Sequence, residues 1–406
     1  MPAGQWSRPA RLSAALKSGA CLDVRLSPLY TEGMTSPRRF DIFLATAPGL
    51  EDVLCAEVRS KGFNSPRAVP GGVTVKGGWP EVWRANLWVR GAGRVLAVLA
   101  SFRALHLDEL RLQARKVAWG EVLRADVPFR VEATCAKSRI YHSGAAAERV
   151  EAAIRQALGA PSSPEAPVLV RVRIERDLAT LAVDTSGEPL HKRGYKQAVA
   201  KAPMRETMAS LFLRQCGFDG DEPILDPMCG SGTFVIEAAE MAARLNPGRA
   251  RRFAFEHLAT FDAAAWARMR DVASRRSPPA SVRFYGGDRD AGAVAMAEAN
   301  AERAGVADLT EFRQRPVSDI AAPDGPPGLV IVNPPYGARI GDGKKLLPLY
   351  RALGQALIAR FPGWRVGLIT SEPALARATG LPFLPPAAPV PHGGLRVTLF
   401  QTAALP

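Results

Sequence analysis

Short apolar segments alternate with longer amphipathic segments from residue 202 to the end of the chain. Such short runs are typical of buried strands, and the segments between them have the apolar spacing of helices. We expect strands at 223–226, 282–288, 310–314, 329–333, 364–371 and 395–402. This alternation predicts an α/β fold with a doubly wound, mostly parallel sheet, in which ligands bind at the carboxyl ends of the strands.

The pattern before residue 202 is more mixed and predicts two smaller α+β units. The first unit is assigned residues 39–105, with strands at 40–46, 71–77 and 94–102 and helices at 49–63 and 79–88. The second is assigned residues 106–190, with a helix at 107–123, a strand at 128–137, a helix that ends at Gly159, and strands at 168–177 and 178–186. The α/β domain is assigned residues 191–406.

The first 33 residues have weak apolar periodicity and lack the hydrophobic core of a signal peptide. An ordered pattern begins directly after Met34. We therefore expect the natural chain to start at Met34, and residues 1–38 to be disordered or absent from the natural protein.

The chain is basic, with 53 Lys and Arg against 39 Asp and Glu and a net charge of +14. This excess attracts a polyanion, either nucleic acid or an anionic membrane, unless it is an ordinary solvated surface. No run approaches the roughly eighteen apolar residues of a membrane span, so a membrane is not expected and nucleic acid is the better partner.

The five cysteines are scattered and form no C-x-x-C pair. An odd number at irregular spacing argues against a disulfide framework and against a zinc site. We expect small buried side chains, no metal, and a cytoplasmic location.

Basic residues with interleaved tyrosines recur between residues 137 and 196, most densely in "LHKRGYKQ". Exposed cations can follow a phosphate backbone, and Tyr141 and Tyr195 could stack on bases. An ordinary solvated face is the alternative. The residues expected to be exposed and to contact RNA are Arg139, Lys192, Arg193 and Lys196.

The loop after the first strand of the α/β domain, "DPMCGSGT", begins at Asp226 and leads into a helix at Thr233. Gly230 and Gly232 allow a tight turn and a close approach to a ligand. The carboxylate of Asp226 would repel a pyrophosphate but can accept hydrogen bonds from an ammonium group. The loop also lacks the G-x-G-x-x-G and G-K-[ST] patterns of phosphate-binding loops.

The second strand of this domain ends at Asp288, where an acidic side chain can bind the hydroxyl groups of a ribose. Asp290, two residues later, fits the structural role of a helix N-cap.

The fourth strand ends in "NPPY", which comprises Asn333, Pro334, Pro335 and Tyr336. Two prolines cannot continue a strand ladder because neither has an N–H group to donate. Alone, the motif would be read as a surface turn; together with the two carboxylates it indicates a ligand site.

These motifs, in this order, resemble class I S-adenosylmethionine-dependent methyltransferases, with "DPMCGSGT" as the cofactor loop and "NPPY" as the signature of amino methyltransferases. The phrases "LHKRGYK", "APMRETMA" and "NPPYGARIGD" further resemble the THUMP-domain RNA methyltransferases that act on N2 of guanine in 23S ribosomal RNA. The resemblance implies a Rossmann-like domain at 191–406 with an antiparallel last strand, preceded by a ferredoxin-like unit at 39–105 and a THUMP domain at 106–190.

By this resemblance the cofactor is S-adenosyl-L-methionine. Asp226 would bind its methionyl amino group, and Glu206 would border the methionyl end. Relatives usually have an aspartate for the adenine amine where this chain has Pro316, and Asp319 is the alternative within the same loop.

The same resemblance implies a catalytic corner made by "NPPY". The side-chain oxygen of Asn333 and the carbonyl of Pro334 would each accept one N–H of the guanine amine and orient its lone pair toward the methyl donor. Tyr336 would stack on a base that has left its helix or loop. No metal is required.

Other functions remain open. A transfer RNA guanine-N2 methyltransferase shares the fold and the "NPPYG" motif, while DNA adenine-N6 and protein glutamine-N5 enzymes share "NPPY" without a basic first half. From a different class, the chain could be a non-catalytic RNA-binding factor in ribosome assembly.

Overall fold

The computed structural model describes residues 39–196, 204–274, 282–337 and 343–406. The expectations about Met34 and about residues 1–38 lie outside these ranges. The described residues all belong to one unit, 39–406.

The first half of the chain folds around a seven-stranded sheet with the order β2-β3-β1-β4-β7-β6-β5. Its strands are β1 (Phe40–Ala45), β2 (Arg67–Val69), β3 (Gly72–Gly77), β4 (Arg94–Arg103), β5 (Phe129–Ala136), β6 (Val168–Glu175) and β7 (Leu178–Asp184). Only β5 and β6 pair in parallel; the other neighbours are antiparallel.

This sheet joins the two units that the sequence pattern separates. The predicted boundary at residue 106 falls after β4, yet β4 pairs with β7 from Leu96↔Asp184 to Arg103↔Leu178, with one irregularity between Val98 and Ala100. The two units therefore share one hydrogen-bonded sheet.

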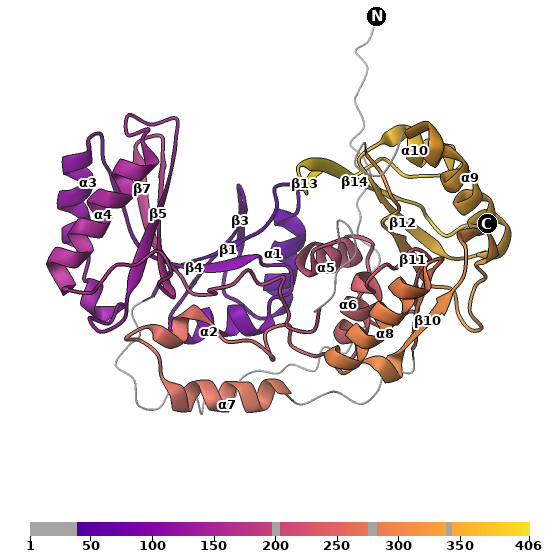
Figure 1. Cartoon of the computed structure of the whole chain (residues 1–406), viewed down its shortest axis with the longest axis horizontal. Helices are drawn as coiled ribbons and strands as arrows, with labels where there is room; N and C mark the ends of the chain where they lie inside the picture. The colour runs from indigo at the N-terminus through magenta and orange to yellow at the C-terminus, as the bar shows by residue number, and fades with distance from the viewer. Residues whose placement is uncertain (1–38, 197–203, 275–281, 338–342) are drawn as a thin grey trace, which may run out of the picture. The chain divides into compact units, whose positions relative to one another are not determined.

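Helices cover this sheet, and α3 and α4 lie side by side next to β5 and β7 (Figure 1). The helices are α1 (Glu51–Ser60), α2 (Trp79–Trp88), α3 (Leu107–Arg115) and α4 (Ser143–Leu158), with a short 3-10 turn, η2 (Trp119–Glu121). The sequence prediction for α2 is confirmed at both ends, and α4 ends as expected at Gly159, a left-handed C-cap with φ of +73°.

The predicted helix at 107–123 is too long. The helix stops at Arg115, and the indole N–H of Trp119 donates to the carbonyl of Ala114 at 2.8 Å. Because a side chain takes up one of the last helical carbonyls, the backbone is free to leave the helix and form η2.

The second half folds around another seven-stranded sheet, with the order β10-β9-β8-β11-β12-β14-β13. Its strands are β8 (Ile224–Asp226), β9 (Phe284–Asp288), β10 (Thr310–Gln314), β11 (Leu329–Val332), β12 (Arg365–Thr370), β13 (Val390–His392) and β14 (Leu395–Gln401). The five strands from β10 to β12 are parallel, and β14 is antiparallel to both of its neighbours. The predicted Rossmann-like fold is confirmed; the short strand β13 was not predicted.

Helices pack on both faces of this sheet (Figure 1). They are α5 (Glu206–Gln215), α6 (Thr233–Ala242), α8 (Ala291–Ala304), α9 (Gly343–Arg360) and α10 (Pro373–Ala378), with the 3-10 turns η4 (Ala307–Leu309) and η5 (Val317–Asp319). Helix α7 (Ala263–Ser274) and the 3-10 turn η3 (Ala254–His257) lie near α2 instead, where Trp266 contacts Phe255 and Phe255 contacts Trp83 (Figure 1). Figure 1 shows α6 and α8 on one face and α9 and α10 on the other. In a parallel sheet covered on both faces, ligands bind at the carboxyl ends of the strands, which here are the ends of β8, β9 and β11.

Candidate active site

A glycine-containing loop connects β8 to α6. Asp226 is the last residue of β8 and Thr233 is the first residue of α6. Gly230 and Gly232 have φ values of +52° and +80°, a backbone region that favours glycine. A Cβ on Gly232 would lie only 3.0 Å from the Cβ of Ala297 in α8. The tight turn predicted at these glycines is confirmed.

Asp226 is a buried carboxylic acid, with an exposed fraction of 2%. Burial raises its pKa to about 8, although the backbone N–H of Met228 donates to its Oδ1 at 3.1 Å and opposes the rise. The charge of Asp288 raises the pKa further. No Lys or Arg in the described ranges forms an ion pair with Asp226. A cationic ligand group would supply the missing countercharge and favour the ionised form.

Asp288, at the end of β9, lies at the same edge of the sheet because β8 and β9 pair in parallel. Its Oδ2 accepts a hydrogen bond from the N–H of Gly230 at 3.1 Å, and its Oδ1 accepts one from the N–H of Asp290 at 3.0 Å. Asp290 caps α8 by accepting from Gly292 at 2.8 Å, so the structural role expected for it is confirmed. Asp288 thus holds the glycine loop and still has lone pairs for a ligand.

The chain leaves β11 through a corner that neighbouring elements hold in place. The hydroxyl of Tyr350 in α9 donates to the carbonyl of Pro335 at 3.2 Å. The N–H of Gly337 donates to Oε1 of Glu372, next to α10, at 2.8 Å. The Oδ1 of Asn333 is buried and accepts no hydrogen bond from the described residues. An unpaired buried acceptor costs roughly 1–3 kcal/mol, so a ligand that donates there is favoured.

A cavity of about 1120 Å³ brings these strand ends together. The predicted catalytic and cofactor-binding residues that line it are Glu206, Asp226, Gly230, Thr233, Asp288, Asn333, Pro334, Pro335 and Tyr336. Lys192, Arg193 and Lys196, predicted to contact RNA, also line it, whereas Gly232 does not. Burial raises the pKa of Tyr336 to about 12, so its ring is neutral. Asp319 does not line this cavity; it is exposed and accepts a hydrogen bond from Ser318 at 2.9 Å.

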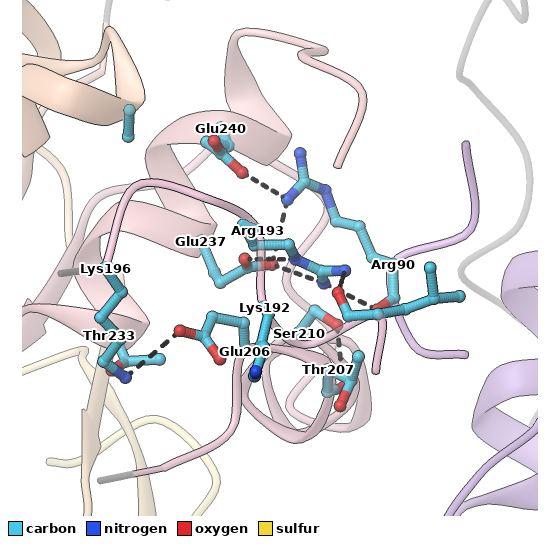
Figure 2. A network of polar contacts seen from close by, with 12 residues as sticks. Arg90, Lys192, Arg193, Lys196, Glu206, Thr207, Ser210, Thr233, Glu237 and Glu240 are labelled. Atoms are coloured by element: carbon cyan, nitrogen blue, oxygen red, sulfur yellow. Dashed lines mark hydrogen bonds and ion pairs between the residues drawn. The ribbon is translucent and has the colours of Figure 1, made fainter. Parts of the chain in front are cut away.

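Lys196 connects the starts of α5 and α6 at the wall of the cavity (Figure 2). Its Nζ donates to Oγ1 of Thr233 at 2.8 Å and to the carbonyl of Met204 at 3.2 Å, and it lies 3.3 Å from Oε1 of Glu206. Burial raises the pKa of Glu206, and the charge of Lys196 opposes this rise. The ammonium group therefore holds a buried carboxylate beside the cofactor loop.

Two buried arginines pair with Glu237 and Glu240 of α6 (Figure 2). Arg90, between α2 and β4, lies 3.0 Å from Glu237 and 2.8 Å from Glu240. Arg193 lies 3.1 Å from the other carboxylate oxygen of Glu237 and donates to the carbonyl of Arg90 at 2.7 Å. The two arginines together lower the pKa of Glu237 against the effect of burial. Helix α6 is thus tied by buried ion pairs to the segment between α2 and β4.

Comparisons with known proteins agree with this architecture. A model of the RMKL-like methyltransferase domain matches residues 193–382, and a model of the RlmL ferredoxin-like domain matches residues 41–96. A solved structure from Listeria monocytogenes, described as a predicted N6-adenine-specific DNA methylase, is 32% identical, with a TM-score of 0.80 over 90% of this chain and 97% of that chain. This chain belongs to the RMKL-like methyltransferase family.

A curated relative and a second solved structure are also similar to this chain. A curated relative from Vibrio campbellii, named ribosomal RNA large subunit methyltransferase K/L, is 36% identical over 343 residues, which are 81% of this chain. The chain spans about half the length of that relative, 48%. A solved structure described as a methyltransferase complexed with SAH is 28% identical, with a TM-score of 0.81 over 92% of this chain and all of that one.

Within this RMKL-like methyltransferase, two of the four basic residues expected at an RNA surface are buried. Arg193 has an exposed fraction of 3%, and the side chain of Lys196 one of 8%. The prediction that they are exposed is wrong because glutamates of α5 and α6 pair with them inside the protein. Tyr195 is also buried. Arg139 and Lys192 are exposed as expected, and their contact with RNA stays a prediction.

Sequence reasoning missed the acidic partners in this network. Glu237 and Glu240 lie in "TFVIEAAEMA", where a charged residue within an otherwise apolar helix was the available signal. Such a residue must either face solvent or find a cation, and apolar neighbours on every side favour the second outcome. The cation itself, Arg90, could not be inferred because it lies 147 positions from Glu237.

The described ranges add no other type of site. They contain no cluster of three or more His, Cys, Asp and Glu side chains suited to a metal, and their four cysteines are free. Among the helices in these ranges, none has the length and apolar character needed to cross a membrane.

Proposed function

We propose that this chain transfers a methyl group from S-adenosyl-L-methionine to the exocyclic N2 of a guanine in RNA, with large-subunit ribosomal RNA as the substrate. The observation that supports this most directly is the side-chain oxygen of Asn333, a buried acceptor that receives no hydrogen bond from the described residues. It lies in the same cavity as two carboxylates suited to the two ends of the cofactor.

The cavity residues fit this cofactor. Asp226 is buried without a cationic partner in the described ranges, as expected for a group that receives the methionyl ammonium. Asp288 can accept hydrogen bonds from ribose hydroxyls with its remaining lone pairs. When bound, the cofactor supplies an activated methyl group on a sulfonium.

The chain's own contribution to the reaction is orientation and electrostatics. The N2 amine of guanine is a poor nucleophile because its lone pair is delocalised into the ring. Oδ1 of Asn333 accepts one N–H and the carbonyl of Pro334 accepts the other, so the nitrogen is turned toward the methyl group. Both bonds become stronger as positive charge develops on the nitrogen, which lowers the barrier.

Support for an RNA substrate comes from relatives and from charge. The curated relative carries a ribosomal RNA name. The net charge of +14 favours a polyanion. We assign residues 106–190 to RNA capture as a THUMP domain, where Arg139 is exposed and Tyr141 has 84% of its surface exposed. A ribosomal RNA substrate is consistent with a cytoplasmic enzyme.

The corner itself does not select guanine over adenine, because an adenine N6 amine offers the same two N–H groups. Nucleoside analysis separates the alternatives: N2-methylguanosine in transfer RNA would indicate the transfer RNA enzyme, and N6-methyladenine would indicate the activity for which the Listeria protein is named. Absence of cofactor binding would favour a non-catalytic assembly factor.

The test combines calorimetry with methyl transfer by purified protein. The wild-type chain should bind S-adenosyl-L-methionine and methylate ribosomal RNA at guanine N2. The Asn333→Ala variant should bind the cofactor nearly as well but lose at least about 100-fold in single-turnover transfer, because the lost bond belongs to the transition state. Equal transfer by the two proteins would contradict the role of Asn333.

A further inference from the structure

The tip of the β13–β14 hairpin forms part of the cavity wall next to the "NPPY" corner. His392 ends β13 and pairs with Leu395 of β14, and the turn between them contains Gly393 and Gly394 with φ values of +57° and +83°. A two-residue turn with positive φ at both positions is the tight hairpin connection that matches strand twist. It fixes His392 at the last position before the turn.

The hairpin tip borders the corner closely. A Cβ on Gly337, directly after Tyr336, would lie 3.0 Å from Cδ1 of Leu395. His392 and Leu395 line the same cavity as Asn333 and Tyr336. A base held at the corner would therefore have the hairpin tip beside it.

His392 has an unsatisfied polar atom in this wall. Its Nδ1 is buried and has no hydrogen-bond partner among the described residues, as is true of Oδ1 in Asn333. Burial lowers the pKa of His392, and the charge of Arg205 lowers it further, so the ring is neutral at pH 7. A neutral imidazole has one nitrogen that can accept a hydrogen bond, and this nitrogen is Nδ1 when Nε2 carries the hydrogen.

We propose that His392 selects the base, with Nδ1 accepting a hydrogen bond from the N1–H of guanine. This inference rests on the proposed function. In guanine the carbon that bears the amine lies between N1, which carries a hydrogen, and N3, which does not. In adenine the one ring nitrogen next to the amine-bearing carbon, N1, is an acceptor. An acceptor in the wall therefore favours guanine at a corner that would otherwise treat the two amines alike.

The test uses the RNA that the wild-type chain methylates, with the target guanine replaced by 2-aminopurine. This analogue keeps the amine at C2 but has no hydrogen on N1. Single-turnover rates on guanine and on 2-aminopurine give a selectivity ratio for each variant, and differences in amine reactivity cancel when ratios are compared. We expect His392→Leu to reduce the wild-type ratio by roughly 10-fold.

Two variants separate recognition from folding. His392→Asn can place its amide oxygen where Nδ1 lies and should retain part of the selectivity. His257→Leu makes the same change at an exposed histidine that does not line the cavity and should keep the wild-type ratio. Unchanged calorimetric binding of S-adenosyl-L-methionine shows that each variant is folded.

The outcomes are distinct. If the wild-type chain methylates guanine in RNA and His392→Leu has the same ratio, the role of His392 is wrong and the proposed function stands. If the wild-type chain transfers no methyl group to guanine, the proposed function fails and this inference fails with it. A control with 6-thioguanine, which keeps N1–H but replaces O6, should behave as guanine. If His392→Leu changes the selectivity ratio measured with 6-thioguanine but not the ratio measured with 2-aminopurine, the assignment to N1–H is overturned.

Discussion

Asp226 and Asn333 share one property at the scale of single residues, since each is a buried polar group whose partner the described chain does not provide. Asp226 lacks a cation and Asn333 lacks a donor. The protein carries this cost in its free state, of the order of 1–3 kcal/mol for a group such as the amide oxygen of Asn333. Binding of an ammonium group and of an amine removes this free-energy cost. Part of the ligand affinity therefore comes from polar groups that the folded protein leaves without partners.

The raised pKa of Asp226 predicts that cofactor binding depends on pH. With a folded pKa of about 8 against an ordinary 3.8, the acid is mostly protonated at pH 7. An ammonium ligand favours the ionised form, so binding should release up to about one proton, and affinity should increase as the pH is raised from 6 to 8. Calorimetry in buffers of different ionisation enthalpy measures this release.

The matched control for that experiment is Asp226→Asn, which has no proton to lose. It should bind the cofactor more weakly and without proton release over the same pH range. A wild-type chain that binds with no proton release would show that Asp226 is already ionised or does not receive the ammonium.

At the scale of elements, α6 connects the cofactor loop at its start to buried ion pairs along its length. Its first residue, Thr233, lies at the cofactor loop, and its third turn carries Glu240, paired with Arg90. Arg193 and Lys196 lie alongside α6, where Arg193 contacts Glu237 and Lys196 contacts Thr233 (Figure 2). The position of the cofactor loop therefore depends on a helix that buried charges hold in register.

Removal of one of these charges should destabilise the protein strongly. Arg193→Ala leaves the buried carboxylate of Glu237 with only one of its two cations, and we expect a loss of roughly 3 kcal/mol in the free energy of unfolding. Lys192→Ala, one position away, breaks an exposed pair with Glu188 and should change stability by no more than about 0.5 kcal/mol. Urea unfolding of both variants tests the difference, and equal losses would contradict the assignment.

The sequence predicted local features of the fold and site well, because those features depend on neighbouring residues. The strand ends at Asp226 and Asp288, the turn at Gly232 and the cap at Asp290 all follow from short motifs. What it could not predict depends on distant contacts. Arg193 and Lys192 are adjacent and both basic, yet one is buried, because a glutamate 44 positions away lies opposite it. The three-residue strand β13, which carries His392, exists only through pairing with β14.

At the scale of the whole molecule, the described chain forms two seven-stranded sheets. The first contains strands from both predicted N-terminal units, joined where β4 pairs with β7. The second presents the strand ends that line the cavity. We assign RNA capture to the first half and methyl transfer to the second, and the excess of basic residues then acts on the RNA backbone rather than on the cofactor.

Exposed basic residues should therefore contribute to RNA binding through phosphate contacts. The double variant Arg139→Ala/Lys192→Ala should weaken binding and reduce the slope of log K against log salt concentration by roughly 1.5. The variant Arg313→Ala/Arg377→Ala removes the same charge from exposed positions in the second half that do not line the cavity. If both variants lose the same affinity and slope, only the net charge matters, and Arg139 and Lys192 have no specific role.

The central claim is that Asn333 presents a guanine amine to an activated methyl group. The most direct test is mass spectrometry of nucleosides from the ribosomal and transfer RNA of cells that lack this protein, complemented with the wild-type gene or with Asn333→Ala. The account predicts that one N2-methylguanosine of large-subunit ribosomal RNA disappears, returns with the wild-type gene and stays absent with the variant. An unchanged set of modified nucleosides in the deletion strain, or full restoration by Asn333→Ala, would contradict it.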